Sequence, residues 1–242
     1  MLLVIAAARP QLVGEPYRLK AENRDIMLVI DISPSMLQPD LSRTQRIDRL
    51  TAVKAVVGSF VQKRTEDRLG VILFGTRAYV QSPLTFDKNA VAEILNNADA
   101  GMAGNSTSIG DALGLALKNL REEKEKNNKV IILLTDGENN DGSLSMAQAI
   151  GLAEKEGIKI YTVGVGSDRN FLGSLFGLGN GELDEKSLKE LAQKTKGNYF
   201  RATDVNSLAE IYTKIDQLEP AKSEGNIVQE KKDLFYIPFL LS

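Results

Sequence analysis

The sequence predicts an α/β protein with a doubly wound, mostly parallel sheet, one antiparallel edge strand and helices on both faces. Short apolar segments alternate along the chain with longer segments in which apolar residues recur every three or four positions. The short segments are nearly continuous in apolar residues, as is typical of strands buried on both faces of a parallel sheet. Such alternation predicts strands joined by right-handed helical crossovers.

The first four elements alternate as this fold requires. The run IMLVID at 26–31 is continuously apolar up to its last residue and predicts a buried strand. The segment 46–64 places its apolar residues on one side of a helix. DRLGVILFG at 67–75 predicts a second buried strand. The segment 77–84 follows after a short Gly-Thr connection, so we expect it to be an antiparallel edge strand paired with its predecessor.

Three helices and the strongest strand follow. A helix is expected at 87–98, with Asp87 as its cap, and a longer one at 106–126, whose mixed charges near the end indicate a solvated face. KVIILLTDG at 129–137 is the clearest strand of the chain. The helix expected at 143–157 ends at a glycine, the usual residue after a helix C-terminus.

The last part of the chain continues the alternation. A fourth buried strand is expected at 158–166, and the glycine-rich segment 167–184 lacks periodicity and indicates a loop or insertion. Three elements complete the fold, namely a helix capped by Asp184, a short strand and a final helix, at 184–197, 198–202 and 204–218.

The composition excludes several kinds of chemistry. The chain has 242 residues, a net charge of −2, no cysteine and no histidine. The small charge gives no electrostatic reason to expect nucleic-acid binding. Without histidine and cysteine, Ser-His-Asp triads, zinc sites built on these side chains and disulfides are excluded. Any bound metal must therefore be held by oxygen, which indicates Mg²⁺, Mn²⁺ or Ca²⁺.

The two ends of the chain differ from its middle. Apolar runs at 1–8 and 234–241 are each too short to cross a bilayer, which takes about 20 apolar residues. They are either ordinary terminal segments or the ends of membrane-spanning helices cut by the boundaries of the sequence. We therefore divide the chain into an N-terminal tail (1–25), one domain (26–218) and a C-terminal tail (219–242).

Oxygen-bearing side chains collect where the predicted strands end. The first strand ends in Asp31, followed by Ser33 and Ser35 at alternate positions, and the clearest strand ends in Asp136. Thr107 opens the long helix, which starts at the same edge of the sheet. In a doubly wound sheet this edge binds ligands near the point where the strand order reverses.

These five residues predict a metal site. We expect no Lys or Arg side chain among them at this rim of the sheet, and a divalent cation would relieve the repulsion between the two aspartates. Mg²⁺ suits hydroxyl ligands and metal-bound waters held by carboxylates. An Asx-turn at Asp31 with a helix cap at Ser35 is the plainer alternative for this loop.

The motif resembles the metal-ion-dependent adhesion site of von Willebrand factor type A domains. The resemblance rests on D-x-S-x-S at 31–35, a threonine in STSIGD and the aspartate of LLTDG, and it covers about 26–218. It implies that Ser33, Ser35 and Thr107 coordinate the metal directly, while Asp31 and Asp136 act mostly through water. It also implies the Rossmann-like von Willebrand A fold. Pro34 stands where the family often has glycine, so the loop is expected to be stiffer.

Further segments, among them QSPLTFD, TSIGDALGLA, LLTDGENNDG and GIKIYTVGVG, resemble the bacterial Bat (aerotolerance-type) family. That family is membrane-anchored by helices on both sides of the domain, which implies a location at the bacterial inner membrane, on a side that the sequence leaves open. The implied partners are MoxR-type AAA+ ATPases and other Bat proteins.

The leading hypothesis is a non-enzymatic, Mg²⁺-dependent protein-interaction module in which a partner's Asp or Glu completes the metal coordination, without nucleic-acid binding. The alternative is a metal-dependent hydrolase that uses the same Asp/Ser/Thr rim, and a third hypothesis is a chelatase-type accessory domain of an AAA+ motor. Ser33 and Ser35 lack a nearby base, which disfavours nucleophilic catalysis. Asp40 is expected to be a solvated loop acid, and Asp111 to interact with its helix N-terminus.

Overall fold

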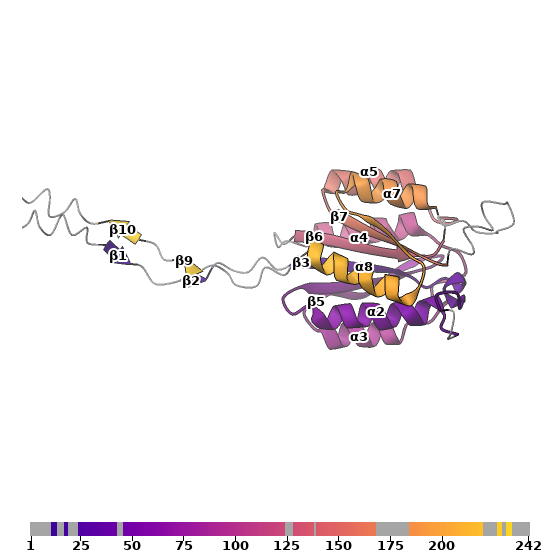
Figure 1. The fold of residues 1–242 in the computed structure, drawn as a ribbon. Coiled ribbons are helices and arrows are strands. Elements are labelled where there is room, and N and C mark those ends of the chain that lie inside the picture. Colours follow the sequence, from indigo (N-terminus) through magenta and orange to yellow (C-terminus); the bar gives the residue numbers. More distant parts are fainter. Residues whose placement is uncertain are drawn as a thin grey trace, which may run out of the picture. The chain divides into compact units, whose positions relative to one another are not determined.

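A computed structural model describes residues 11–13, 17–18, 24–42, 46–123, 128–137, 139–167, 184–219, 227–228 and 231–233. Its central sheet has the strand order β5-β4-β3-β6-β7-β8, with β4 and β5 antiparallel and the other pairs parallel (Figure 1). The strands are β3 (Arg24–Asp31), β4 (Arg68–Phe74), β5 (Ala78–Thr85), β6 (Asn128–Thr135), β7 (Lys159–Val165) and β8 (Tyr199–Ala202). The predicted fold class, including the antiparallel edge strand, is confirmed.

The helices begin and end close to the predicted limits, except that the long helix is shorter than 106–126. They are α2 (Arg49–Lys63), α3 (Lys88–Asn96), α4 (Ile109–Glu122), α5 (Met146–Glu156), α7 (Glu185–Lys194) and α8 (Val205–Leu218), and a 3₁₀ helix that was not predicted, η1 (Pro34–Leu37), follows β3. Asp87 and Asp184 cap their helices as expected, each accepting a hydrogen bond from a first-turn N–H. Gly157 ends α5 in the left-handed conformation, at φ 65°.

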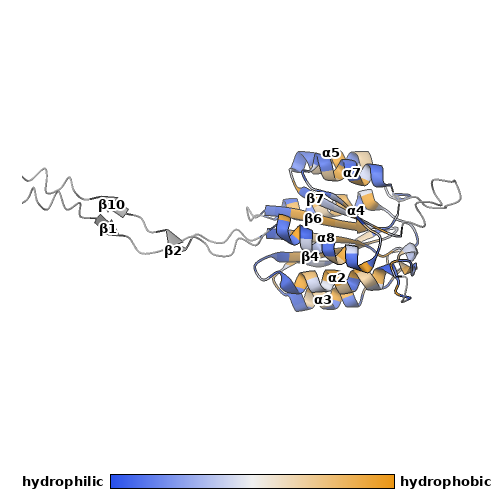
Figure 2. Cartoon of the chain, viewed as in Figure 1, coloured by the Kyte–Doolittle hydropathy of each residue, from blue (hydrophilic) through white to orange (hydrophobic). Residues whose placement is uncertain are grey.

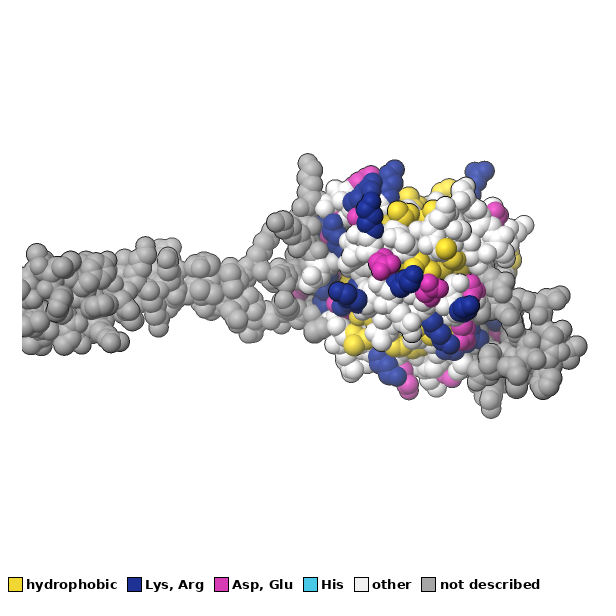
Figure 3. All heavy atoms as spheres, turned by 90° about the horizontal axis from the view of Figure 1, so that it is seen from above, with side chains coloured by type: hydrophobic (Ala, Val, Ile, Leu, Met, Phe, Trp, Pro, Cys, Tyr) yellow, Lys and Arg dark blue, Asp and Glu magenta, His cyan; other side chains and the backbone are white. Residues whose placement is uncertain are grey.

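Two apolar layers enclose the sheet because successive strand residues point to opposite faces. Leu28 and Ile30 of β3 pack with α2, α3 and α8, whereas Met27 and Val29 pack with α4, α5 and α7. Figure 2 shows the apolar strands between helices whose outer sides are hydrophilic. In Figure 3, Lys and Arg side chains intermingle with Asp and Glu over the face in view, with small hydrophobic areas between them.

The strand order reverses at β3, which lies between β4 and β6. Ile30 is in register with Leu73 of β4 and with Leu134 of β6. The carboxyl ends of these neighbouring strands therefore lie side by side, where ligands bind in doubly wound sheets. The predicted site residues Asp31 and Asp136 stand at the ends of β3 and β6.

The amino-terminal ends of β3 and β4, opposite the carboxyl ends just described, carry a buried ion-pair cluster, which we call the basal cluster. Asp67, just before β4, accepts two hydrogen bonds from Arg24, at 3.0 and 3.1 Å, and one from Arg64, at 3.1 Å. Arg64 follows α2 and also donates to the carbonyl of Glu219, which follows α8. The Glu219 carboxylate accepts from Tyr161 and pairs with Lys159. The cluster thus joins the first residue of β3, the end of α2 and the end of α8.

The two ends of the chain form a unit of their own, Met1–Glu22 with Lys222–Ser242, apart from Asn23–Ala221. In it β1 (Gln11–Val13) pairs antiparallel with β10 (Lys231–Asp233), and β2 (Tyr17–Arg18) pairs antiparallel with β9 (Ile227–Val228). No strand is expected there from the sequence. Both apolar runs, 1–8 and 234–241, lie outside the described residues. Within those residues, no helix combines the length and apolar character that crossing a bilayer requires.

Candidate metal centre

The loop after β3 brings two serine hydroxyls together. Pro34 starts the 3₁₀ turn η1, because its fixed φ and missing N–H suit the first position of a helical turn. The N–H of Ser33 donates to Asp31 Oδ1 at 2.9 Å, and the Ser33 and Ser35 Oγ atoms lie 2.9 Å apart. The Asx-turn expected as the plainer alternative is therefore present, but it also presents both hydroxyls on one side of the loop.

Asp136 joins this pair from the neighbouring strand. Its Oδ1 accepts a hydrogen bond of 2.8 Å from Ser35 Oγ. Thr135, the last residue of β6, donates its hydroxyl to Asp31 Oδ2 at 2.7 Å. Asp31 is fully buried and Asp136 is buried. A chain of hydrogen bonds therefore joins four of the five predicted site residues, in the order Asp31, Ser33, Ser35 and Asp136.

Thr107 lies just before α4 and is buried. Its backbone binds Asn140, with Thr107 N–H donating to the Asn140 side chain at 2.8 Å and Thr107 C=O accepting from Asn140 N–H at 3.1 Å. A Cβ atom built on Gly137, next to Asp136, would lie 3.8 Å from Thr107 Oγ1. The hydroxyl is therefore beside the Asp136 segment. The neighbouring Ser108 uses its own hydroxyl on the carbonyl of Thr76.

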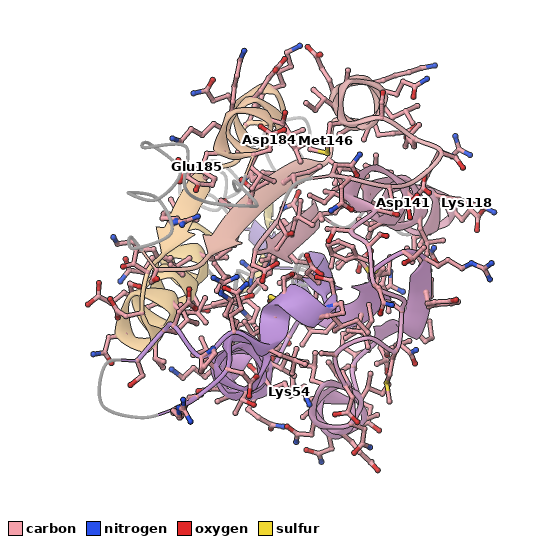
Figure 4. The ribbon with its side chains drawn as sticks, turned by 90° about the vertical axis from the view of Figure 1, so that its right-hand side faces the viewer. Lys54, Lys118, Asp141, Met146, Asp184 and Glu185 are labelled. Carbon is pink, nitrogen blue, oxygen red and sulfur yellow. The ribbon has the colours of Figure 1, made fainter. Side chains whose placement is uncertain are left out.

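Figure 4 looks onto the carboxyl ends of the strands, with Lys54 of α2, Asp141 of the loop after β6 and Asp184 before α7 around them.

The loop after β6 is hydrogen-bonded to the start of α4. Asn139 accepts from Gly110 N–H at 3.0 Å, and Asp111 accepts from Leu144 N–H at 2.8 Å. Asp111 therefore anchors the loop after β6, a role that was not predicted from the sequence. The polar residues that follow Asp136 were the one feature of the sequence that could have indicated a loop needing such an anchor.

Burial changes the acidity of Asp31. Removal from water and, to a smaller extent, the negative charge of Asp136 raise the pKa of its carboxyl to about 6, although hydrogen bonds from Thr135 and Ser33 act in the opposite direction. Asp31 and Asp136 are therefore close enough to repel each other. A cation between the hydroxyls and these carboxylates would relieve that repulsion.

This shift predicts how pH affects the stability of the metal-free protein. The folded state keeps a proton on Asp31 up to about pH 6, whereas the unfolded chain releases it near the ordinary value of 3.8. The folded state thus binds more protons in this window, and the free energy of unfolding should fall by about 3 kcal/mol as pH rises from 4 to above 6. Urea unfolding in EDTA at several pH values measures this contribution, and Asp31→Asn should remove it. Parallel pH curves for the two proteins would contradict it.

One expectation about this rim is wrong, because a cation does lie within it. Arg49, the first residue of α2, is buried and donates through Nη1 to Asp136 Oδ2 at 2.7 Å. It also donates to both carboxylate oxygens of Asp40, at 2.8 and 2.5 Å. Asp40 is therefore a bound partner and not a solvated loop acid. Burial opposes its charge, but the hydrogen bonds from Arg49 hold the pKa of Asp40 below its usual value.

The charge of the rim still fits a divalent cation. Asp31, Asp40 and Asp136 with the single guanidinium of Arg49 carry a formal charge of −2. The described residues contain no group of three or more acidic side chains of the kind that would enclose an ion by themselves. Three hydroxyls supply the other oxygen atoms, so the donor set suits a hard cation that keeps several waters.

A family model for the von Willebrand factor type A domain matches residues 25–214. The chain belongs to this family. The relative "Uncharacterized protein" of Borreliella burgdorferi is 27% identical over 244 residues, covering 97% of this chain and 70% of that protein. The chain spans about two thirds of the length of the curated relatives that it matches over most of its own length.

Solved structures of other proteins are similar to this one. An aerotolerance-related membrane protein from Bacteroides fragilis is 26% identical, with a TM-score of 0.64 over 81% of this chain and 100% of that one. The predicted resemblance to the aerotolerance-type proteins is thus confirmed. Proximal thread matrix protein 1 from the mussel byssus, solved with a zinc-occupied MIDAS (metal-ion-dependent adhesion site) motif, shares the fold at 24% identity, with a TM-score of 0.61 over 93% of this chain and 51% of that one.

Glu138, next to Asp136, and the segment 168–183 of this von Willebrand A domain lie outside the described residues.

Proposed function

We propose that this chain is a non-enzymatic protein-interaction module that depends on Mg²⁺ and binds a carboxylate of its partner. The observation that carries the proposal is the convergence of Ser33, Ser35 and Thr107 with Asp136 at the reversal point of the sheet. Neutral hydroxyls outnumber carboxylates among these donors. A cation held in this way keeps much of its charge and favours an anionic ligand from outside.

The donors have different roles in this proposal. Ser33, Ser35 and Thr107 would contact the ion, and Asp31 and Asp136 would hold its waters. Both oxygens of Asp31 already accept hydrogen bonds, from Ser33 N–H and Thr135 Oγ1, which favours an indirect role. Mg²⁺ is the preferred ion because it retains waters readily, with Mn²⁺ and Ca²⁺ as alternatives. The zinc in the mussel protein's MIDAS motif supports a divalent ion in general.

A protein-binding role fits these side chains better than hydrolysis. The chain has no histidine, and Ser35 donates to a carboxylate that also binds Arg49. Asp136 is thus already engaged in an ion pair with that guanidinium, which disfavours its use as a general base for the serine. Membership in a family of interaction modules supports the same conclusion.

For the full-length protein we extend the proposal to its setting. The B. fragilis protein is described as an aerotolerance-related membrane protein, which supports anchoring in a bacterial membrane through helices that flank the domain. The pairing of β1 with β10 and of β2 with β9 supports this, since it keeps the two ends of the chain together. The proposed partners are a MoxR-type AAA+ ATPase and other Bat proteins, acting in stress or aerotolerance. Titration of the purified ATPase with and without EDTA would test the first of them.

The metal site has a direct test in Thr107→Val. Among the described residues, nothing hydrogen-bonds the Thr107 hydroxyl, so its loss should leave the metal-free fold within about 1 kcal/mol of the native protein. In thermal-unfolding assays, Mg²⁺ at 100 times its Kd should stabilise the native protein by about 2.7 kcal/mol and the variant by much less.

The matched control for this test is Thr213→Val, which removes a hydroxyl from the exposed face of α8. It should keep the full Mg²⁺ effect. If Mg²⁺ and Mn²⁺ failed to stabilise the native chain, or if Thr107→Val kept the whole effect, the proposed metal-dependent function would be wrong.

A further inference from the structure

Arg49 is held at the rim by two loops directly and by a third through Asp40. Its Nη1 binds Asp136 after β6, its Nε and Nη2 bind Asp40, and Nη2 also donates to Gln38 Oε1 at 3.1 Å. Asp40 in turn accepts from the N–H of Ser167 after β7, at 3.1 Å. The guanidinium is therefore fixed by hydrogen bonds from several sides and is buried.

The frame leaves the guanidinium little room to move. Gly166 adopts φ 148°, and a Cβ atom there would lie 3.1 Å from Arg49 Nη2. Burial opposes the charge of Arg49, but Asp40 and Asp136 together hold its pKa above the usual value, so it stays cationic. A fixed, charged fork that serves two carboxylates at once is a geometry that arginine provides and lysine does not.

Because Arg49 is fixed in this position, the two carboxylate oxygens of Asp136 have different partners. Oδ2 accepts from Arg49, and Oδ1 accepts from Ser35, the hydroxyl on the metal side. We propose that Arg49 determines the metal specificity of this site by leaving Asp136 only one oxygen, which can hold a water of Mg²⁺, as proposed above, but cannot join Oδ2 in binding an ion directly. The inference rests on the proposed metal-dependent function and adds the residue that chooses the ion.

The two cations differ in what they need from a carboxylate. Ca²⁺ takes six to eight oxygens and often binds a carboxylate through both of them, whereas Mg²⁺ takes six, keeps its waters and accepts one carboxylate oxygen. With Oδ2 of Asp136 engaged by Arg49, bidentate binding is blocked, which penalises Ca²⁺ more than Mg²⁺. The positive charge of Arg49 weakens both ions alike, because both are divalent, so it cancels in the ratio of their affinities.

The experiment measures the Kd of Mg²⁺ and of Ca²⁺ by isothermal titration on the full chain and on Arg49→Gln. The ratio of Kd for Ca²⁺ to Kd for Mg²⁺ should fall about tenfold in the variant, the usual scale for losing a partner of a metal ligand. Arg49→Lys keeps the charge without the fork and should shift the ratio in the same direction. Circular dichroism on each variant establishes that it is folded.

The matched control is Arg68→Gln, which removes an arginine from a part-buried ion pair with Asp25 at the opposite edge of the sheet. It should lower stability and leave the ratio unchanged. A purely structural role for Arg49 predicts the same unchanged ratio for Arg49→Gln and Arg49→Lys, and that result would overturn the inference while leaving the metal site itself in place. Absence of binding by either ion to the native chain would overturn both proposals.

Discussion

Replacing Asp67 with alanine is expected to lower the free energy of unfolding by about 3–5 kcal/mol, because it leaves two buried guanidinium groups without their shared carboxylate. Arg24 and Arg64 converge on Asp67 through three hydrogen bonds of 3.0–3.1 Å, and each of the three side chains is at most 4% exposed. Chemical unfolding in urea measures the loss.

The control for this prediction removes a cation together with the acid. The double variant Asp67→Leu with Arg24→Met should recover part of the lost stability, since an apolar pair can replace a buried ion pair at little cost. Mg²⁺-dependent stabilisation should persist in both variants, because the basal cluster lies at the edge of the sheet opposite Asp31. A loss below about 1 kcal/mol for Asp67→Ala would show that water or other groups satisfy these arginines.

Gly110→Ala is expected to destabilise the protein by about 3 kcal/mol, although alanine normally favours a helix over glycine by about 1 kcal/mol. Gly110 lies in the first turn of α4, where a Cβ atom would come within 1.9 Å of the carbonyl oxygen of Leu144. Backbone must therefore move on one side or the other. Since Thr107 precedes this turn, the variant should also weaken Mg²⁺-dependent stabilisation.

Gly151→Ala in α5 is the matched control, because a Cβ atom there meets nothing within 4 Å. It should raise the free energy of unfolding by about 0.5–1 kcal/mol and leave the metal effect intact. Thermal and urea unfolding of both variants, with and without Mg²⁺, separate the two effects. Equal stability of the two alanine variants would show that α4 and the Leu144 loop do not approach as closely as described.

The fold could be predicted from the sequence because its signals are local. The short apolar run within 129–137, bounded by Lys129 and Asp136, is typical of a strand buried on both faces. Asp87, Asp184 and Gly157 mark helix limits through their own side chains or backbone freedom. The paired tail strands were missed because two or three residues in extended pairing carry no periodic signal.

The candidate site was predicted in part. Asp31, Ser33, Ser35 and Asp136 meet because strand ends at a reversal point must be neighbours, which is a rule of topology. Arg49 was missed because a long side chain on a helix reaches the rim from outside the motif. The signal was nevertheless present, since the helix at 46–64 must begin at the same edge and Arg49 opens it.

Helix α2 joins the two charged clusters of the domain. Its first residue, Arg49, binds Asp136, and its cap, Arg64, binds Asp67 and the Glu219 carbonyl, about 22 Å away along a helix of 15 residues. Tension applied beyond Glu219 would therefore reach the end of α2 through Arg64, and β7 through Lys159 and Tyr161. Because the same helix carries both contacts, a displacement of α2 along its axis would strain the Arg49–Asp136 contact at its other end.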